Sequence, residues 1–178
     1  MAKKQMFVTR LADALVKLQI FSEQEADGLV KEFHGRAKGR IDDFLLTEGI
    51  VDREVLLKAL QSVYGILPFD VRGHFFNHQL LLFFPKDFLL NKGVIPLDVD
   101  DEIMTVVMSN PEDEETIDTL SRYVSYNVNI FVGIQRDIGD AIAEYYDEDV
   151  VTADIEEQEK DIDEDDMQDS DIIDLPEN

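Results

Sequence analysis

The stretch that decides the fold spans residues 40–51 and reads R-I-D-D-F-L-L-T-E-G-I-V. A related stretch, R-L-A-D-A-L-V-K-L-Q-I-F, lies 30 residues earlier, at residues 10–21. In both, apolar residues recur at three- and four-residue intervals, which is typical of helices with one buried stripe. A residue suited to an N-cap follows each stretch, Ser22 in the first copy and Asp52 in the second. We therefore expect residues 1–67 to hold a duplicated two-helix repeat that folds as one four-helix unit.

The pattern changes after residue 67. Two runs rich in β-branched residues, 94–99 and 103–108, flank three acidic residues, which predicts a β-hairpin. Asn110 and Pro111 have the character of an N-cap and a first helical position. A further β-rich run at 127–132 precedes a last helix. The buried face of that helix is expected to be Ile138, Ala141, Ile142 and Tyr145. These elements predict a small α/β module over residues 68–146, and an α+β fold for the chain.

Acidic residues dominate residues 147–178. This segment contains 16 acidic residues and one basic residue, Lys160. It cannot bury enough apolar surface to offset the entropy of ordering, so we predict a disordered acidic tail. Two interpretations of the tail stay open, a solvating linker and a docking peptide built on Ile172, Ile173 and Leu175.

Net charge and composition exclude several classes of function. The formal charge of -24 opposes binding to nucleic acid and to anionic membranes, because both require clustered basic residues. The longest apolar run, residues 80–84, is far too short to span a bilayer, and residues 6–8 are too short for the core of a signal peptide. The chain has no cysteine, so thiolate metal sites and cysteine nucleophiles are excluded. We expect a cytoplasmic protein that does not insert into a membrane itself.

Motifs for catalysis or metal binding are not found in the sequence. The nine glycines form neither a G-x-x-x-x-G-K-[ST] loop nor a G-x-G-x-x-G loop, so nucleotide hydrolysis by this chain is not expected. His74 and His78 have the i,i+4 spacing of a helical metal pair, but their surroundings favour ordinary loop histidines. Asp100 and Asp101 are interpreted as turn residues. The sequence thus predicts no enzyme, no metal site and no cofactor.

Residues 40–51, followed by Leu56 and Leu60, resemble the R-L-G-x-x-L-L-x-x-G-L-I-x-x-x-x-L-x-x-x-L-x-x-Q motif. This motif belongs to the N-terminal domain of type II secretion and type IV pilus assembly ATPases. The stretches at 94–97, 106–111 and 117–120 resemble the I-P-L, V-A-M-x-D-P and L-D-D-L stretches of the same domain. The chain is therefore similar to that domain from about residue 9 to residue 146, without the ATPase core that follows it in the family.

The resemblance implies a function in binding. The family's domain contacts an inner-membrane assembly protein, and in some members the tandem repeats bind cyclic di-GMP. Carried over to this sequence, the motif positions that would face that ligand are Arg10, Leu11, Leu15, Arg40, Ile41, Leu45 and Gly49. The sequence departs from the motif at its first glycine, which is Ala12 or Asp42, and at its second, which is Gln19 in the first copy.

The resemblance therefore leads us to expect a non-enzymatic docking or regulatory domain of a type II secretion or type IV pilus assembly system. Its partner would be an ATPase core or an inner-membrane assembly protein, which would recruit the chain to the inner membrane. The alternative is a cyclic di-GMP sensor that acts through the tandem Arg-Leu repeats.

Overall fold

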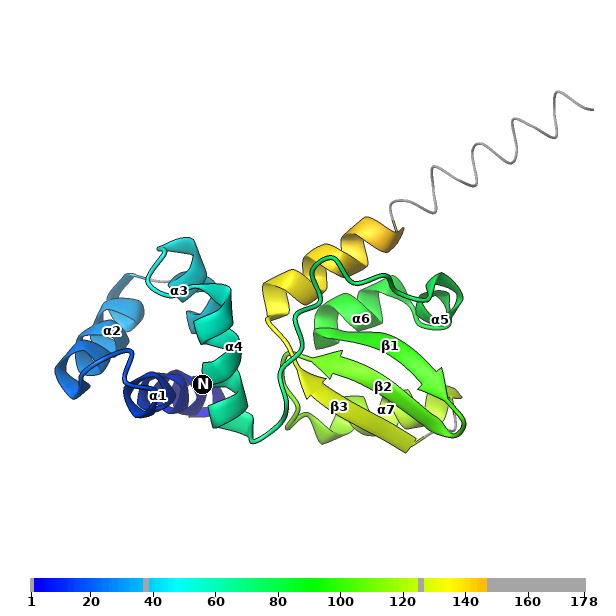
Figure 1. The fold of residues 1–178 in the computed structure, drawn as a ribbon, viewed down its shortest axis with the longest axis horizontal. Coiled ribbons are helices and arrows are strands. Elements are labelled where there is room, and N and C mark those ends of the chain that lie inside the picture. The colour runs from blue at the N-terminus through cyan, green and yellow to red at the C-terminus, as the bar shows by residue number, and fades with distance from the viewer. Residues whose placement is uncertain (1, 37–38, 125–126, 147–178) are drawn as a thin grey trace, which may run out of the picture. The chain divides into compact units, whose positions relative to one another are not determined.

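The structure is a computed structural model that describes residues 2–36, 39–124 and 127–146. Residues 1–142 form one compact unit. The elements are α1 (Ala2–Lys17), α2 (Glu23–Arg36), α3 (Ile41–Thr47), α4 (Arg53–Tyr64), α5 (His78–Leu82), α6 (Lys86–Lys92), β1 (Val94–Asp100), β2 (Ile103–Met108), α7 (Glu114–Val124) and β3 (Asn127–Val132), followed by a helix over residues 135–146 (Figure 1). The predicted α+β class is confirmed. The tail prediction lies outside the described residues, and the division at residues 67 and 146 stays a prediction.

The duplicated repeat recurs in the backbone as well as in the sequence. In the first copy the Ile20 amide donates to the Leu15 carbonyl at 3.0 Å, and 30 residues later the Ile50 amide donates to the Leu45 carbonyl at 2.9 Å. The residue that closes each turn is left-handed, with φ 59° at Gln19 and φ 63° at Gly49. The two helix-to-helix turns therefore have the same geometry.

Helix caps also follow the sequence. Ser22 and Glu25 form a reciprocal capping box, in which the Ser22 amide donates to the Glu25 carboxylate at 2.8 Å and the Glu25 amide donates to Ser22 Oγ at 3.3 Å. The Asp52 carboxylate accepts from the Val55 amide at 2.8 Å and begins α4. Both N-caps inferred for the repeat, Ser22 and Asp52, are confirmed.

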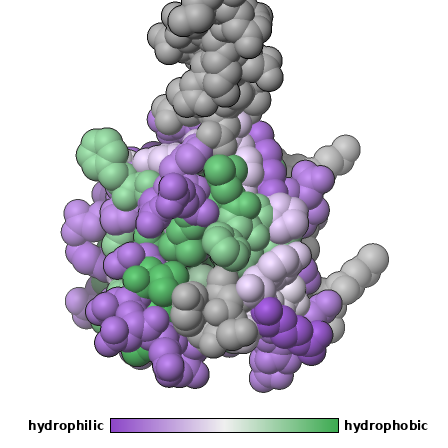
Figure 2. Space-filling view, turned by 90° about the vertical axis from the view of Figure 1, so that its right-hand side faces the viewer, coloured by the Kyte–Doolittle hydropathy of each residue, from purple (hydrophilic) through white to green (hydrophobic). Residues whose placement is uncertain are grey.

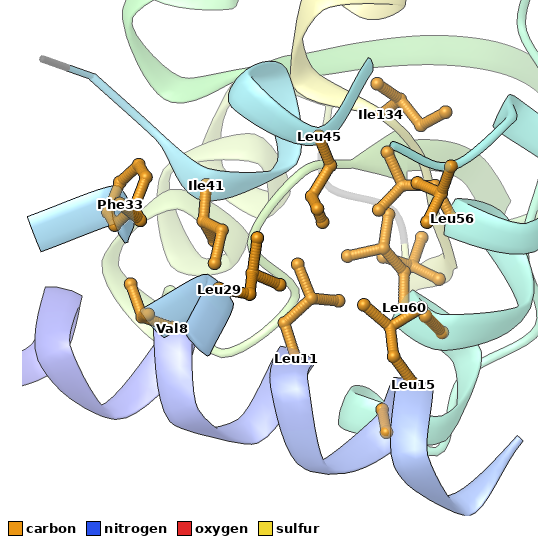
Figure 3. Close-up of a cluster of buried hydrophobic side chains, with 14 residues drawn as sticks. Val8, Leu11, Leu15, Leu29, Phe33, Ile41, Leu45, Leu56, Leu60 and Ile134 are labelled. Carbon is orange, nitrogen blue, oxygen red and sulfur yellow. The ribbon is translucent and has the colours of Figure 1, made fainter. Parts of the chain in front are cut away.

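The four repeat helices share one apolar core. Most of its residues come from α1 to α4, and Val132 and Ile134 from the α/β part complete it. Figure 3 shows Leu11, Leu15, Leu45, Leu56 and Leu60 converging, with Ile134 beside them. These leucines are fully buried. The helical repeat and the sheet are therefore held together by common apolar burial.

The sheet has the order β1-β2-β3. β1 and β2 form the predicted antiparallel hairpin, with a register shift between Pro96 and Asp98. β3 pairs with β2 in parallel over residues 127–132. In the following helix Ile138, Ala141 and Ile142 are buried as expected, and Tyr145 is half-buried.

Two helices differ from the sequence-based expectation. α7 begins at Glu114 rather than at Pro111, because Asn110 and Pro111 form a turn in which the Asp113 amide donates to the Asn110 carbonyl at 3.1 Å. Asp113 then caps the helix by accepting from the Thr116 amide at 3.3 Å. α5 was not expected, because it has only five residues and its hydrophobic run lacks helical periodicity.

A cluster of ion pairs links α4, the connection after it and the last helix. Asp137 is 4% exposed, and its carboxylate accepts from Arg53 Nε at 3.1 Å. Arg72 Nε lies 3.7 Å from the same carboxylate and hydrogen-bonds Asp70 with Nη2 at 2.6 Å. The hydrogen bonds from Arg72 lower the pKa of Asp70 from its ordinary value of 3.8. A buried carboxylate needs such partners, because a lone charge in the interior is strongly unfavourable.

Gln19→Gly is expected to stabilise the protein by about 1 kcal/mol, because a non-glycine residue in the left-handed region carries a steric cost of that order. The converse change, Gly49→Gln, should destabilise it by a similar amount. Urea unfolding followed by circular dichroism measures both. Equal stabilities for wild type and Gln19→Gly would contradict the left-handed conformation of this turn.

The Asp70 carboxyl is expected to titrate below pH 3.8, and Arg72→Gln should move its midpoint upward. Since the folded-state pKa is lowered, the stabilising contribution is present above pH 3.8 and is lost as the pH falls through the folded value. Carbon-detected NMR of the Asp70 carboxyl measures the midpoint, with Arg122→Gln as a control distant in sequence. An Asp70 midpoint that Arg72→Gln leaves unchanged would rule out this pairing.

Candidate functional site

The two repeat arginines line one pocket of about 450 Å³, which we call the arginine pocket. Arg10 belongs to α1, and Arg40 is the residue directly before α3. The other lining residues are Met6, Phe7, Val8, Ile41, Tyr64, Asn110 and Glu112. Residues that the repeat places 30 positions apart are thus brought to the same site, next to two residues of the α/β part.

Each arginine lies over an aromatic ring. The guanidinium carbon of Arg10 is 5.4 Å from the centre of the Tyr64 ring, and that of Arg40 is 5.0 Å from the centre of the Phe7 ring. Phe7 and Tyr64 are themselves stacked, with their ring centres 6.1 Å apart. Burial raises the pKa of Tyr64 to about 12, so its hydroxyl is neutral at physiological pH. The pocket therefore combines cations with flat apolar surfaces, which suits a planar anionic ligand.

Both guanidinium groups already have carboxylate partners. Arg10 contacts the two carboxylate oxygens of Glu112 at 2.8 and 2.9 Å, and its Nη2 donates to the Val63 carbonyl at 2.6 Å. The hydrogen bond to Glu112 raises the pKa of Arg10. Arg40 Nε and Nη2 donate to the Asp42 carboxylate at 2.9 and 3.1 Å. A ligand anion at either arginine must compete with these carboxylates.

The apolar residues of the motif do not line the pocket, with one exception. Leu11, Leu15 and Leu45 are at most 1% exposed and lie in the helical core. Ile41 is equally buried but borders the pocket. Gly49 is exposed at the turn after α3 and is not among the residues that line the pocket. Of the seven motif residues expected to face a ligand, Arg10, Arg40 and Ile41 line the pocket, and the other four do not.

The pocket also contains residues that sequence reasoning did not single out as site residues. Phe7, Tyr64 and Glu112 are brought to Arg10 and Arg40 by the packing of α1, α4 and the α/β part. Asn110 had been interpreted as a helix cap. None of these residues occupies a repeat position that is shared by both copies, so the 30-residue period gave no signal for them.

A second surface feature surrounds α5. Phe75 is 92% exposed, and in the segment that follows Leu82 and Phe83 are 51% and 66% exposed. We call these three residues the α5 surface. Figure 2 shows apolar side chains gathered on the face of the molecule that carries α5 and the β1–β2 turn. Exposed apolar clusters of this kind mark sites where proteins bind other molecules.

Metal binding and membrane crossing find no support in the described part of the chain. No group of three or more histidine, aspartate or glutamate residues is placed there to hold a metal ion. His74 packs edge-on against Phe69 and Phe76 in the connection before α5, in agreement with the interpretation as a loop histidine, whereas His78 is the first residue of α5 and not a loop residue. None of the described helices has the length and apolar character needed to cross a bilayer.

Comparison with known proteins connects this fold to secretion and pilus ATPases. The MshEN domain family model matches residues 67–152. The type IV pilus assembly ATPase PilB of Myxococcus xanthus (strain DK1622) is 25% identical over 139 residues, which are 78% of this chain and 24% of that protein. The chain thus spans about a quarter of the length of this relative.

Two solved structures also match the chain. MshE with cyclic di-GMP (cdg) matches with a TM-score of 0.59 and 20% identity, over 76% of this chain and 98% of that chain. The N-terminal domain of XpsE matches with a TM-score of 0.49 and 18% identity, over 76% of this chain and 92% of that chain. The resemblance seen in the sequence motifs is confirmed: residues 67–152 match the MshEN domain family model, and the chain resembles the N-terminal domain of type II secretion and type IV pilus assembly ATPases.

Proposed function

We propose that this chain is a docking and regulatory domain of a type II secretion or type IV pilus assembly system, and that it acts by binding rather than by catalysis. Its partner would be the ATPase core or an inner-membrane assembly protein, met on the cytoplasmic side of the membrane. The match to the MshEN family model supports a role in a secretion or pilus assembly system, and the exposed apolar residues of the α5 surface support the docking role.

The α5 surface is presented by a segment that is itself well anchored. Leu81 and Phe84 are 1% and 2% exposed, so they fix the segment while Leu82 and Phe83 point outward. Behind them, Phe84 packs edge-on against Tyr123 with ring centres 5.4 Å apart. Burying a phenylalanine or leucine side chain that was exposed contributes roughly 1.5–3 kcal/mol. A partner that covers Phe75 and Phe83 would therefore gain a substantial part of its binding free energy there.

The docking proposal predicts that Phe75→Ser combined with Phe83→Ser lowers partner binding at least tenfold, while the fold is retained. Pull-down and surface plasmon resonance with the purified ATPase core and with the inner-membrane assembly protein measure this. Leu67→Ser is the matched control, because Leu67 is 62% exposed but lies outside the α5 surface. Equal binding by the double variant and the control would contradict docking at the α5 surface.

A second candidate function is cyclic di-GMP sensing, and the arginine pocket favours it. Two arginines, each over an aromatic ring, converge where a ligand with phosphates and planar bases could meet both charges and flat surfaces. MshE, whose structure includes cyclic di-GMP, shares the fold. The carboxylates of Glu112 and Asp42 already neutralise the two guanidinium groups, which lowers the affinity that a phosphate ligand can reach there.

The sensing proposal predicts saturable binding of cyclic di-GMP that Arg10→Ala and Arg40→Ala each weaken at least tenfold. Isothermal titration calorimetry measures the affinity, and Arg122→Ala serves as a control because Arg122 does not line the pocket. The chain has no tryptophan, so Phe7→Trp provides a fluorescence reporter inside the pocket. No heat and no fluorescence change at about 0.5 mM ligand, a concentration well above that of a micromolar site, would exclude the sensing function.

A further inference from the structure

The two edges of the sheet are protected to different degrees. β1 contains Pro96, a register shift after it, and the exposed carboxylates of Asp98 and Asp100. Proline, irregular register and charge are the devices by which edge strands avoid pairing with other chains. β3 has none of them: its sequence is N-V-N-I-F-V, its register with β2 is unbroken, and it carries no charged residue.

Backbone hydrogen bonds show which groups of β3 face outward. The Asn127 amide donates to the Glu102 carbonyl at 2.9 Å, and the Gly133 amide donates to the Met108 carbonyl at 3.0 Å. Because the backbone groups of a strand alternate in direction, odd-numbered residues bond to β2 and even-numbered residues point away from it. Val132 confirms this alternation, since its amide and carbonyl bond outward to Leu67 and Phe69 at 3.0 and 2.9 Å.

In the described part of the chain, the outward edge is covered only at its end. Residues 67–69 reach Val132, and within residues 2–36, 39–124 and 127–146 no main-chain hydrogen bond is found to the outward groups of Val128 and Ile130. The open edge therefore extends over residues 127–131. Asn127 and Asn129 are exposed along it, and Val128 and Ile130 are half-buried.

We propose that this edge pairs with the same edge of a second copy of the chain. A twofold axis through Asn129 places Val128 opposite Ile130 of the other copy in an antiparallel pair. Opposed residues of this type exchange both of their N–H···O bonds, so the two pairs form four main-chain hydrogen bonds. These bonds use the outward groups of Val128 and Ile130 in both copies and leave the β2–β3 ladder intact.

The side chains fit the same arrangement. Val128 packs beside Ile130 of the second copy, which is a favourable cross-strand pair of β-branched residues. The two Asn129 amides meet at the axis, where each has both a donor and an acceptor. Because Val132 is already paired with residues 67–69, only residues 127–131 can pair with a second copy. The twofold arrangement pairs all five of them. Two three-stranded sheets thereby become one six-stranded sheet.

The association is expected to be weak and to depend on salt. One short strand per copy forms a contact of the small, transient class, so we expect a dissociation constant in the range of ~0.1–1 mM. Each copy carries a net charge of -24, so the copies repel one another and higher salt should strengthen the dimer.

Sedimentation equilibrium of the full chain between about 10 µM and 1 mM, a range spanning the expected weak affinity, tests the proposal. We expect a mass that rises with concentration, and slower amide exchange at Val128 and Ile130 in concentrated samples. Asn129→Lys should raise the dissociation constant at least tenfold by placing two ammonium groups at the axis, whereas Asn129→Ser should leave it within about threefold. Val128→Pro removes an outward N–H and should act like Asn129→Lys.

A chain that stays monomeric at about 1 mM, in the weakest expected range, would overturn the proposal. So would dimerisation that Asn129→Lys does not weaken, because the copies would then meet through another surface, such as the α5 surface. Circular dichroism of each variant separates loss of pairing from loss of fold. Asn129 is exposed, so its lysine variant keeps the test valid even where the proline variant unfolds.

Discussion

The joint burial of the two apolar stripes is the constraint on which the rest of the structure depends. Leu11 and Ile41 occupy matching positions in the buried stripes of the two copies, and both lie in one core that Val132 and Ile134 complete. Each arginine directly precedes one of these residues in the sequence. Burial of Leu11 and Ile41 in one core therefore places Arg10 and Arg40 together at the edge of that core. The arginine pocket is thus a geometric consequence of duplication and packing.

The two arginines of the pocket are held with unequal strength. Asp42, the partner of Arg40, has a side chain that is 2% exposed, so its carboxylate cannot leave without becoming an unpaired buried charge. Glu112, the partner of Arg10, has a side chain that is 56% exposed, and its carboxylate can turn into water at a cost of about 1 kcal/mol or less. A ligand would therefore displace Glu112 from Arg10 more readily than Asp42 from Arg40.

Local signals in the sequence predict much of the fold but little of the site. The repeat, both of its N-caps and the three strands follow from periodicity, capping residues and β-branched runs. The sequence places the start of α7 at Pro111, three residues too early. Asn110 and Asp113 are both suitable N-cap residues, and in the structure Asn110 forms a turn while Asp113 caps the helix. The partners in the pocket, Tyr64 and Glu112, come from elements separated from Arg10 by more than 50 residues, so only tertiary packing could bring them there.

The three proposed interactions depend on different physical forces, so their affinities should respond differently to ionic strength. A cyclic di-GMP complex depends on attraction between phosphates and arginines, so added salt should weaken it. Docking at the α5 surface depends on apolar burial, which salt changes little over the physiological range. Edge pairing brings together two chains of -24 each, so it alone should strengthen as repulsion is screened. The sign of the salt dependence thus distinguishes nucleotide binding, partner docking and self-association of this chain before any residue is changed.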